Sequence, residues 1–280
     1  MATSVSSVVE STTRIRLPLP DFSRFKLSFN VPSRVIDAVW IAIIFVSAIW
    51  IGWQVVEFIS ATLHWSDVWT AVVDGFYTLI RVTILIAMAS LIWVPIGVGI
   101  GLRPSLAEKV QPIAQFMAAF PANILFPAAV VLIVHFGLNA NIWLSPLMIL
   151  GTQWYILFNV IAGASAFPGD LKEAAQSFHL SGWKWWRYVI LPGIFPYYIT
   201  GAITASGGSW NAAIVAEVAS WGDQKLTAVG LGSYIANATE AGDFQRVVLG
   251  IVVMSIYVTL FNRLLWRPLY AFAENRLRMG

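Results

Sequence analysis

The chain has 280 residues, of which 58% are hydrophobic and only 11% charged, with a formal net charge of +3. Soluble domains carry about 25% charged residues, so this composition excludes an ordinary water-soluble fold and predicts a membrane protein. The absence of cysteine excludes disulfide bridges and thiolate metal sites.

The first 34 residues are rich in Ser and Thr, with prolines at 18, 20 and 32. They contain no continuous apolar run before a small-residue cleavage site, so a removable signal peptide is not expected. We predict a loose cytoplasmic tail over 1–34. The alternative is a short amphipathic element along the membrane surface, formed by Phe22, Phe25, Leu27 and Phe29.

A helix needs about 20 apolar residues to cross the hydrocarbon core of a bilayer. Six stretches of suitable length follow one another, near 35–57, 77–102, 112–135, 142–163, 194–219 and 246–266. They predict an all-α polytopic membrane protein with a six-helix domain over 35–267 and a short cytoplasmic tail over 268–280. Pro121 and Pro127 predict a kink in the third span.

The basic residues predict the orientation of these spans. Of the 17 Lys and Arg residues, Lys225 lies in a segment on the outer side and Arg81 and Arg246 lie near span ends; all the others fall on the side of the two termini. The positive-inside rule therefore places both termini in the cytoplasm. Because these charges are split among several stretches and form no single patch, nucleic-acid binding is not expected.

A polar, basic segment over about 164–193 separates the fourth and fifth spans; we call it the coupling loop. Asp170 and Glu173 suit a helix start, Ala174 and Ala175 propagate the helix, and Leu180-Ser181-Gly182 is expected to end it. Such a short helix, with a small and closely approachable face, can dock into a cleft of a soluble partner. Interfacial anchors follow it, namely Trp183, Trp185, Trp186 and Tyr188, with Lys184 and Arg187 facing anionic headgroups.

The triplet Glu173-Ala174-Ala175, followed by a turn and then Leu191-Pro192, resembles the EAA loop of binding-protein-dependent importer permeases, the transmembrane subunits of ATP-binding-cassette (ABC) importers. The resemblance extends from about Asp67 onward and is greatest to the nitrate, sulfonate and taurine branch. It is strengthened by 209–217 and 262–270, which look like parts of duplicated anion-transport permeases. Further residues that carry it are Pro121, Phe126-Pro127, Phe136-Gly137, Asn159, Gly163, Gly201, Glu217 and Gly230-Leu231-Gly232.

The resemblance implies a type I importer fold in the bacterial inner membrane and import of a small anion by alternating access. It also implies three partners: an ABC ATPase that binds ATP and Mg²⁺, an extracytoplasmic solute-binding protein, and a second permease subunit, identical or homologous. No cofactor is expected on this chain, which lacks a phosphate-binding loop of the form Gly-x-x-x-x-Gly-Lys-Ser/Thr. The family pattern has Gly where this chain has His179, with Gly182 three positions later, so we expect a reshaped turn.

The fifth span is dense in small and hydroxylated residues. Ser206, Ser209 and Asn211 are candidates for hydrogen bonds to a passing solute, the alternative being bonds to neighbouring helices. Arg81 and Glu217 lie near the outer ends of their spans, where an unpaired charge is costly. They predict a structural ion pair, an Arg81 side chain that extends to the membrane interface, or a gate at which Arg81 attracts the anion.

Two other classes of function remain open, an intramembrane enzyme and a membrane scaffold without transport. His64, His135 and His179 fall in loops or at span ends on different sides, and no two carboxylates share a span interior, which disfavours acid–base catalysis. The run Gly97-Val98-Gly99-Ile100-Gly101 ends an apolar span, so it indicates close helix packing and not a dinucleotide site.

Overall fold

The computed structural model describes residues 32–276 and divides at Gly52 into two units. Most of the predicted tail, including the amphipathic alternative over 22–29, lies outside the described residues. Helix α1 (Ser33–Ser60) has no buried residue and is apolar on all sides, which is typical of a helix surrounded by lipid. The predicted first span is therefore a helix.

The second unit begins with α2 (Trp65–Gly101), which starts well before the predicted position near 77. Its start is explained by Asp67, whose carboxylate accepts the backbone N–H of His64 at 2.9 Å and so pairs a donor at the helix end. At 37 residues, α2 is longer than a bilayer requires.

The predicted third span is not one continuous helix. It consists of α3 (Pro104–Ala119), a 3₁₀ turn (Ala122–Leu125) and α4 (Phe126–His135), with a bend of 76° between the two parts. Pro121 lies at the bend and confirms the predicted kink. Pro127 lies in the first turn of α4, where a proline is tolerated, and does not bend it.

The fourth span is also broken, by 43°, into α5 (Ala140–Trp143) with a 3₁₀ turn (Ser145–Met148) and then α6 (Gln153–Ser165). The described residues thus contain four continuous helices long and apolar enough to cross a membrane, or six crossings if each bent pair counts as one. That number agrees with the predicted six.

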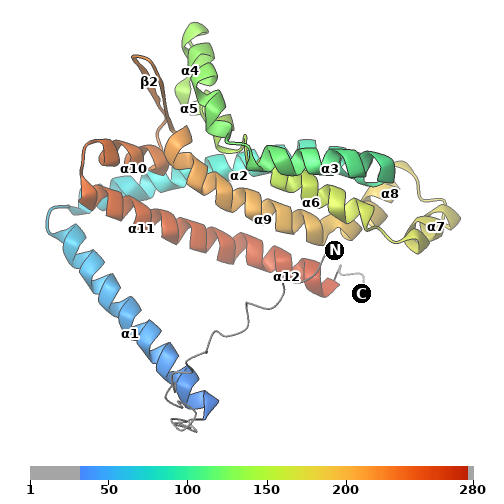
Figure 1. Ribbon diagram of the computed structural model, residues 1–280, viewed down its shortest axis with the longest axis horizontal. Coiled ribbons are helices and arrows are strands. Elements are labelled where there is room, and N and C mark those ends of the chain that lie inside the picture. Colours follow the sequence, from blue (N-terminus) through green and yellow to red (C-terminus); the bar gives the residue numbers. More distant parts are fainter. Residues whose placement is uncertain (1–31, 277–280) are drawn as a thin grey trace, which may run out of the picture. The chain divides into compact units, whose positions relative to one another are not determined.

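The coupling loop folds into α7 (Gly169–Ser177), α8 (Gly182–Trp185) and a π-helical turn (Trp186–Ile190) that runs into α9 (Leu191–Ala216). Helix α9 packs against α2, α6, α10 and α12 and is the centre of the unit. The coupling loop lies at one end of this bundle (Figure 1).

A hairpin of β1 (Val218–Trp221) and antiparallel β2 (Gln224–Thr227) and the short helix α10 (Leu231–Glu240) lie at the opposite end (Figure 1). Then α11 (Phe244–Phe261) returns through the bundle, passes a π-helical turn (Asn262–Trp266) and continues as α12 (Arg267–Arg276). Most of the predicted tail over 268–280 is therefore a helix, and it packs on α9.

Glycines allow a close approach between α2 and α6. A Cβ at Gly97 would lie 2.8 Å from a Val160 methyl, and one at Gly101 would lie 2.6 Å from the Ala164 Cβ. Both distances are shorter than carbon atoms tolerate, so these two glycines let the helices touch. The interpretation of the glycine run as helix packing is confirmed.

Candidate functional site

The coupling loop presents one exposed face of α7. Asp170, Glu173 and Ala174 are exposed, whereas Ala175 is only 3% exposed and faces the bundle. The exposed positions recur at helical spacing and are followed on the same side by Phe178, a phenyl ring that is 78% exposed. The result is a small acidic face with an aromatic tip, open to a docking partner.

His179 ends α7 in a left-handed conformation, with a φ of 52°. Its backbone N–H donates to the carbonyl of Gln176 at 2.9 Å, and the N–H of Leu180 donates to the carbonyl of Ala175 at 2.9 Å. This pair of bonds is a Schellman cap, which usually has glycine at the left-handed position. His179 thus takes a backbone conformation that glycine readily adopts, and the helix ends at Ser177, before Leu180-Ser181-Gly182.

The second half of the coupling loop turns back into the bundle. The side chains of Trp183 and Tyr188 are 71% and 65% exposed, whereas Trp185 and Trp186 pack against the core. Leu191 is exposed, and Pro192 lies where the π-helical turn passes into α9. A cavity of about 350 Å³ lies behind this segment, between Pro168, Tyr197 and Tyr270.

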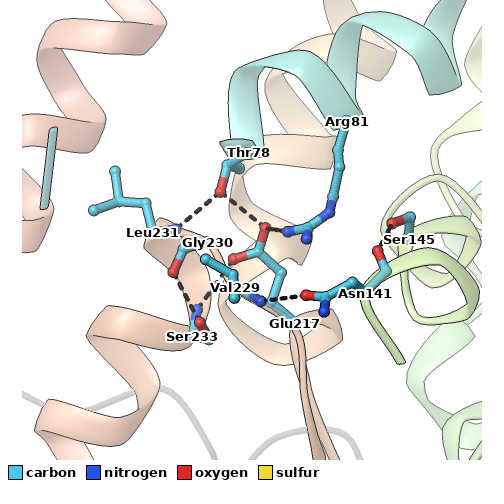
Figure 2. Close-up of polar contacts among 9 residues, drawn as sticks. All are labelled: Thr78, Arg81, Asn141, Ser145, Glu217, Val229, Gly230, Leu231 and Ser233. Carbon is cyan, nitrogen blue, oxygen red and sulfur yellow. Dashed lines mark hydrogen bonds and ion pairs between the residues drawn. The ribbon is translucent and has the colours of Figure 1, made fainter. Parts of the chain in front are cut away.

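At the opposite end of the bundle, Glu217 is the centre of a buried hydrogen-bond network (Figure 2). Its carboxylate, 1% exposed, accepts from the Thr78 hydroxyl at 2.8 Å, from the Arg81 guanidinium at 2.8 Å and from the Ser233 N–H at 3.1 Å. The Thr78 hydroxyl also accepts the Leu231 N–H at 2.9 Å. We call Glu217, Thr78, Arg81, Leu231 and Ser233 the Glu217 network.

Two glycines make room for the Glu217 network. A Cβ on Gly230 would overlap the Glu217 carboxylate, and one on Gly232 would overlap the Ala213 carbonyl of α9. The N–H of Val229 donates to the Asn141 side chain at 2.8 Å, which attaches the same turn to α5 (Figure 2). The Glu217 network therefore joins α2 and the end of α9 to α10 at one end of the bundle.

The Glu217 network contains one of the arrangements predicted for Arg81. The ion pair weighed as the plain alternative is present, and the Arg81 side chain is only 13% exposed. Sequence reasoning missed Thr78, Ser233 and Asn141. The run Gly230-Leu231-Gly232 was the available signal, because two glycines flanking an apolar residue indicate close approach by another group.

The three pathway candidates separate into two groups. The Ser206 hydroxyl lies 3.3 Å from the Trp266 ring nitrogen, which donates to it, and the Ser209 hydroxyl lies 3.0 Å from that of Thr152. Both serines are buried in helix packing, which agrees with the predicted alternative of bonds to neighbouring helices. Asn211 is exposed, and its side chain forms no hydrogen bond with another described residue.

Asn211 belongs to an exposed polar stripe along α9, which we define as Thr200, Thr204, Gly207 and Asn211. These positions recur at intervals of three or four and so share one side of the helix. The two threonine hydroxyls donate to Pro196 and Thr200 carbonyls of their own helix, at 3.0 and 2.9 Å, which leaves their oxygen lone pairs facing outward. A lipid-facing helix would carry large apolar side chains here.

Titratable groups outside the spans give no catalytic arrangement in the described part of the chain. In α10, burial raises the pKa of Tyr234 to about 12, so its phenol is neutral at physiological pH. Among residues 32–276 there is no cluster of three or more His, Asp or Glu that could hold a metal ion.

Comparisons with known proteins agree with this geometry. The family "binding-protein-dependent transport system inner membrane component" matches residues 92–273. A nitrate import permease protein of Leptolyngbya laminosa is 26% identical over 211 residues, which are 70% of this chain and 72% of that protein. A bicarbonate transport system permease protein of Synechococcus elongatus is 28% identical over 186 residues, 66% of this chain and 64% of that protein.

Two further similarities bear on substrate and fold. A taurine transport system permease protein of Escherichia coli is 26% identical over 187 residues, 66% of this chain and 64% of that protein. Among solved structures, an inward-facing MetNI methionine ABC transporter has a TM-score of 0.58 at 21% identity, covering 75% of this chain and 99% of that chain. At this identity the structural match shows the fold alone.

Proposed function

Because this chain belongs to the family of binding-protein-dependent transport system inner membrane components, we propose that it is the permease subunit through which an ATP-driven importer moves a small anion. The coupling loop and the polar stripe of α9 support this proposal from the structure. They lie on one bundle, the first at its end and the second along its central helix.

The observation that carries the proposal is the exposed face of α7. Asp170, Glu173 and Ala174 are left uncovered while Ala175 seats the helix on the bundle. We propose that an ABC ATPase binds this face from the cytoplasm, that ATP and Mg²⁺ bind on that ATPase, and that this chain binds no cofactor directly. The cap at His179 preserves the helix end that such docking requires.

We propose that the solute passes along the polar stripe of α9. The stripe offers neutral oxygen and amide groups, which contact an anion without trapping it by charge. A second permease subunit, identical or homologous, would complete the pathway, and the hairpin of β1 and β2 would face an extracytoplasmic solute-binding protein. Nitrate, bicarbonate and sulfonates are the substrates suggested by the names of the relatives.

The Glu217 network has a structural part in this proposal. Alternating access requires the bundle to move between two packings as a whole, and a buried network that connects α2 and α9 with α10 lets these helices move together at the outer end. Arg81 serves as the partner of Glu217 and is not the primary attraction for the anion.

Uptake into proteoliposomes tests the proposal. The chain is reconstituted with an ATPase and a solute-binding protein that co-purify with it, and ATP-dependent uptake of radiolabelled or isotopically labelled nitrate, bicarbonate and taurine is compared. We expect uptake of one anion that requires all three proteins. The variant Glu173→Arg should abolish uptake, whereas Glu108→Arg, the same charge change on an exposed position of α3, should retain it. Uptake that needs no ATPase would contradict the proposal.

A further inference from the structure

A second cavity, of about 440 Å³, opens between α9, α11 and the start of α12. It is lined by Ile203, Thr259, Asn262, Arg263, Arg267 and Tyr270, and we call it the arginine pocket. Tyr270 also lines the cavity behind the coupling loop. The arginine pocket is therefore at the same end of the bundle as the coupling loop.

The charge of the arginine pocket is not neutralised within the described part of the chain. Arg81 and Arg246 form ion pairs with carboxylates, but Arg263 and Arg267 form none there, and no carboxylate lines the pocket. The two arginines are four residues apart, a spacing at which like charges on a helix repel. An anion between them would remove that repulsion.

The π-helical turn Asn262–Trp266 explains why both arginines face outward. It turns Trp266 into the core, 5% exposed, where its ring N–H donates to the Ser206 hydroxyl at 3.3 Å. Arg263 and Arg267, on either side of this anchored residue, are left exposed. Such π-helical turns are frequent at functional sites.

The other polar lining groups suit the same ligand. Asn262, Thr259 and Tyr270 offer an amide and two hydroxyls, each of which can donate a hydrogen bond. A guanidinium is planar and binds two oxygens of a phosphate, sulfonate or carboxylate at once. Because the pocket offers several hydrogen-bond donors and no carboxylate, it favours an oxyanion as its ligand.

The position of the arginine pocket along α11 matches the level of the lipid headgroups in a bilayer. Arg263 is 19 residues beyond Phe244, the first residue of α11. At about 1.5 Å per residue this distance is about 29 Å, close to the thickness of the hydrocarbon core. If α11 begins at one surface, the arginine pocket lies at the headgroup level of the other.

We propose that the arginine pocket binds an oxyanion at the membrane surface. Two sources share this chemistry, the phosphate of an anionic lipid headgroup and a small free oxyanion. The site is independent of the proposed import function, because it is defined by binding to this chain alone and its test involves neither ATP nor uptake.

Binding to the purified full chain in lipid nanodiscs tests the inference. In phosphatidylcholine discs, affinity for radiolabelled sulfate is measured; in discs that also contain phosphatidylglycerol, retained phosphatidylglycerol is quantified by mass spectrometry after detergent exchange. In the double variant Arg263→Gln/Arg267→Gln, either the affinity for sulfate or the amount of retained phosphatidylglycerol should fall at least about tenfold, because charged hydrogen bonds are removed. The matched control Arg103→Gln/Lys109→Gln removes the same charge from α3 and should bind like the wild type.

The two arms distinguish the sources. If the glutamine variant loses the sulfate binding of the wild type, the site takes a free oxyanion. If the wild type binds no sulfate and the variant retains less phosphatidylglycerol, the site takes a lipid headgroup. Arg263→Lys/Arg267→Lys should recover part of the lost binding, which shows that the glutamine variant lost charge and not its fold. Equal sulfate affinity and equal lipid retention in the wild type and the glutamine variant would overturn the proposal.

Discussion

Replacing Glu217 by Gln removes one charge from the Glu217 network while keeping the size of the side chain. The Arg81 guanidinium, whose side chain is only 13% exposed, then has no counter-charge. The Ser233 N–H also loses its carboxylate acceptor. Removing one partner of a buried ion pair costs about 3–5 kcal/mol. Since Arg81 keeps slight contact with solvent, we expect the lower limit, about 3 kcal/mol.

This loss should be visible as a lower melting temperature. For a domain of this size, 1 kcal/mol corresponds to about 2–4 °C, so Glu217→Gln should melt about 6–12 °C below the wild type. Tryptophan fluorescence in detergent is a suitable readout, because Trp210 is buried near the network in α9 and 2% exposed. Adding Arg81→Gln to Glu217→Gln should recover part of the loss, since the unpaired charge is then removed.

The matched control is Glu240→Gln at the same end of the bundle. Glu240 forms an ion pair with Lys225, but their side chains are 68% and 41% exposed, and exposed pairs contribute about 0–1 kcal/mol. This variant should melt within about 4 °C of the wild type. A shift for Glu217→Gln no larger than that of the control, or no recovery in the double variant, would refute the reasoning.

Three further predictions concern the coupling loop and α9. His179→Gly should raise the melting temperature by about 2–4 °C, because it relieves roughly 1 kcal/mol of left-handed strain; a lower temperature would contradict the cap assignment. Ala174→Trp should leave ATP hydrolysis by the assembled importer intact but abolish uptake, and retained uptake would count against docking at α7. Cysteines replacing Thr204 and Asn211 should react with a water-soluble maleimide, while one replacing Ser209 should not; the opposite pattern would contradict the polar stripe.

The sequence predicted the number and order of the spans but not their breaks. Hydropathy measures how apolar a segment is, and the third span is apolar on both sides of Pro121. Only the geometry shows that the backbone turns by 76° at Phe120-Pro121 instead of bending slightly. The kink could be predicted from the proline, whereas its size depends on the packing of α4 against the hairpin strand β1.

The three candidate pathway residues could not be told apart for a different reason. Ser206, Ser209 and Asn211 are similar in chemistry, but they lie on different sides of α9. The small residues Gly201, Ala205 and Ser209 mark the side that touches other helices, and the exposed threonines mark the opposite side. A helical-phase argument from the sequence could have separated Asn211 from the two serines, because both sets recur at intervals of three or four.

The Glu217 network was predicted only in part. Glu217 and Arg81 attract attention because a charge near a span interior is costly. Thr78 and Asn141 are ordinary polar residues in sequence, and nothing local indicates that their partners come from a turn about 150 and 90 residues further along the chain. Long-range contacts of this kind need the fold.

The central claim is that α7 transmits the movement of a nucleotide-driven partner to this chain. Photo-crosslinking in living cells tests it most directly, with a photoreactive amino acid placed at the exposed Ala174 and, as a control, at Lys225 at the other end of the bundle. The account predicts an adduct between position 174 and an ATP-binding protein, and none of that kind from position 225. No such adduct from position 174, or one only with an extracytoplasmic protein, would contradict it.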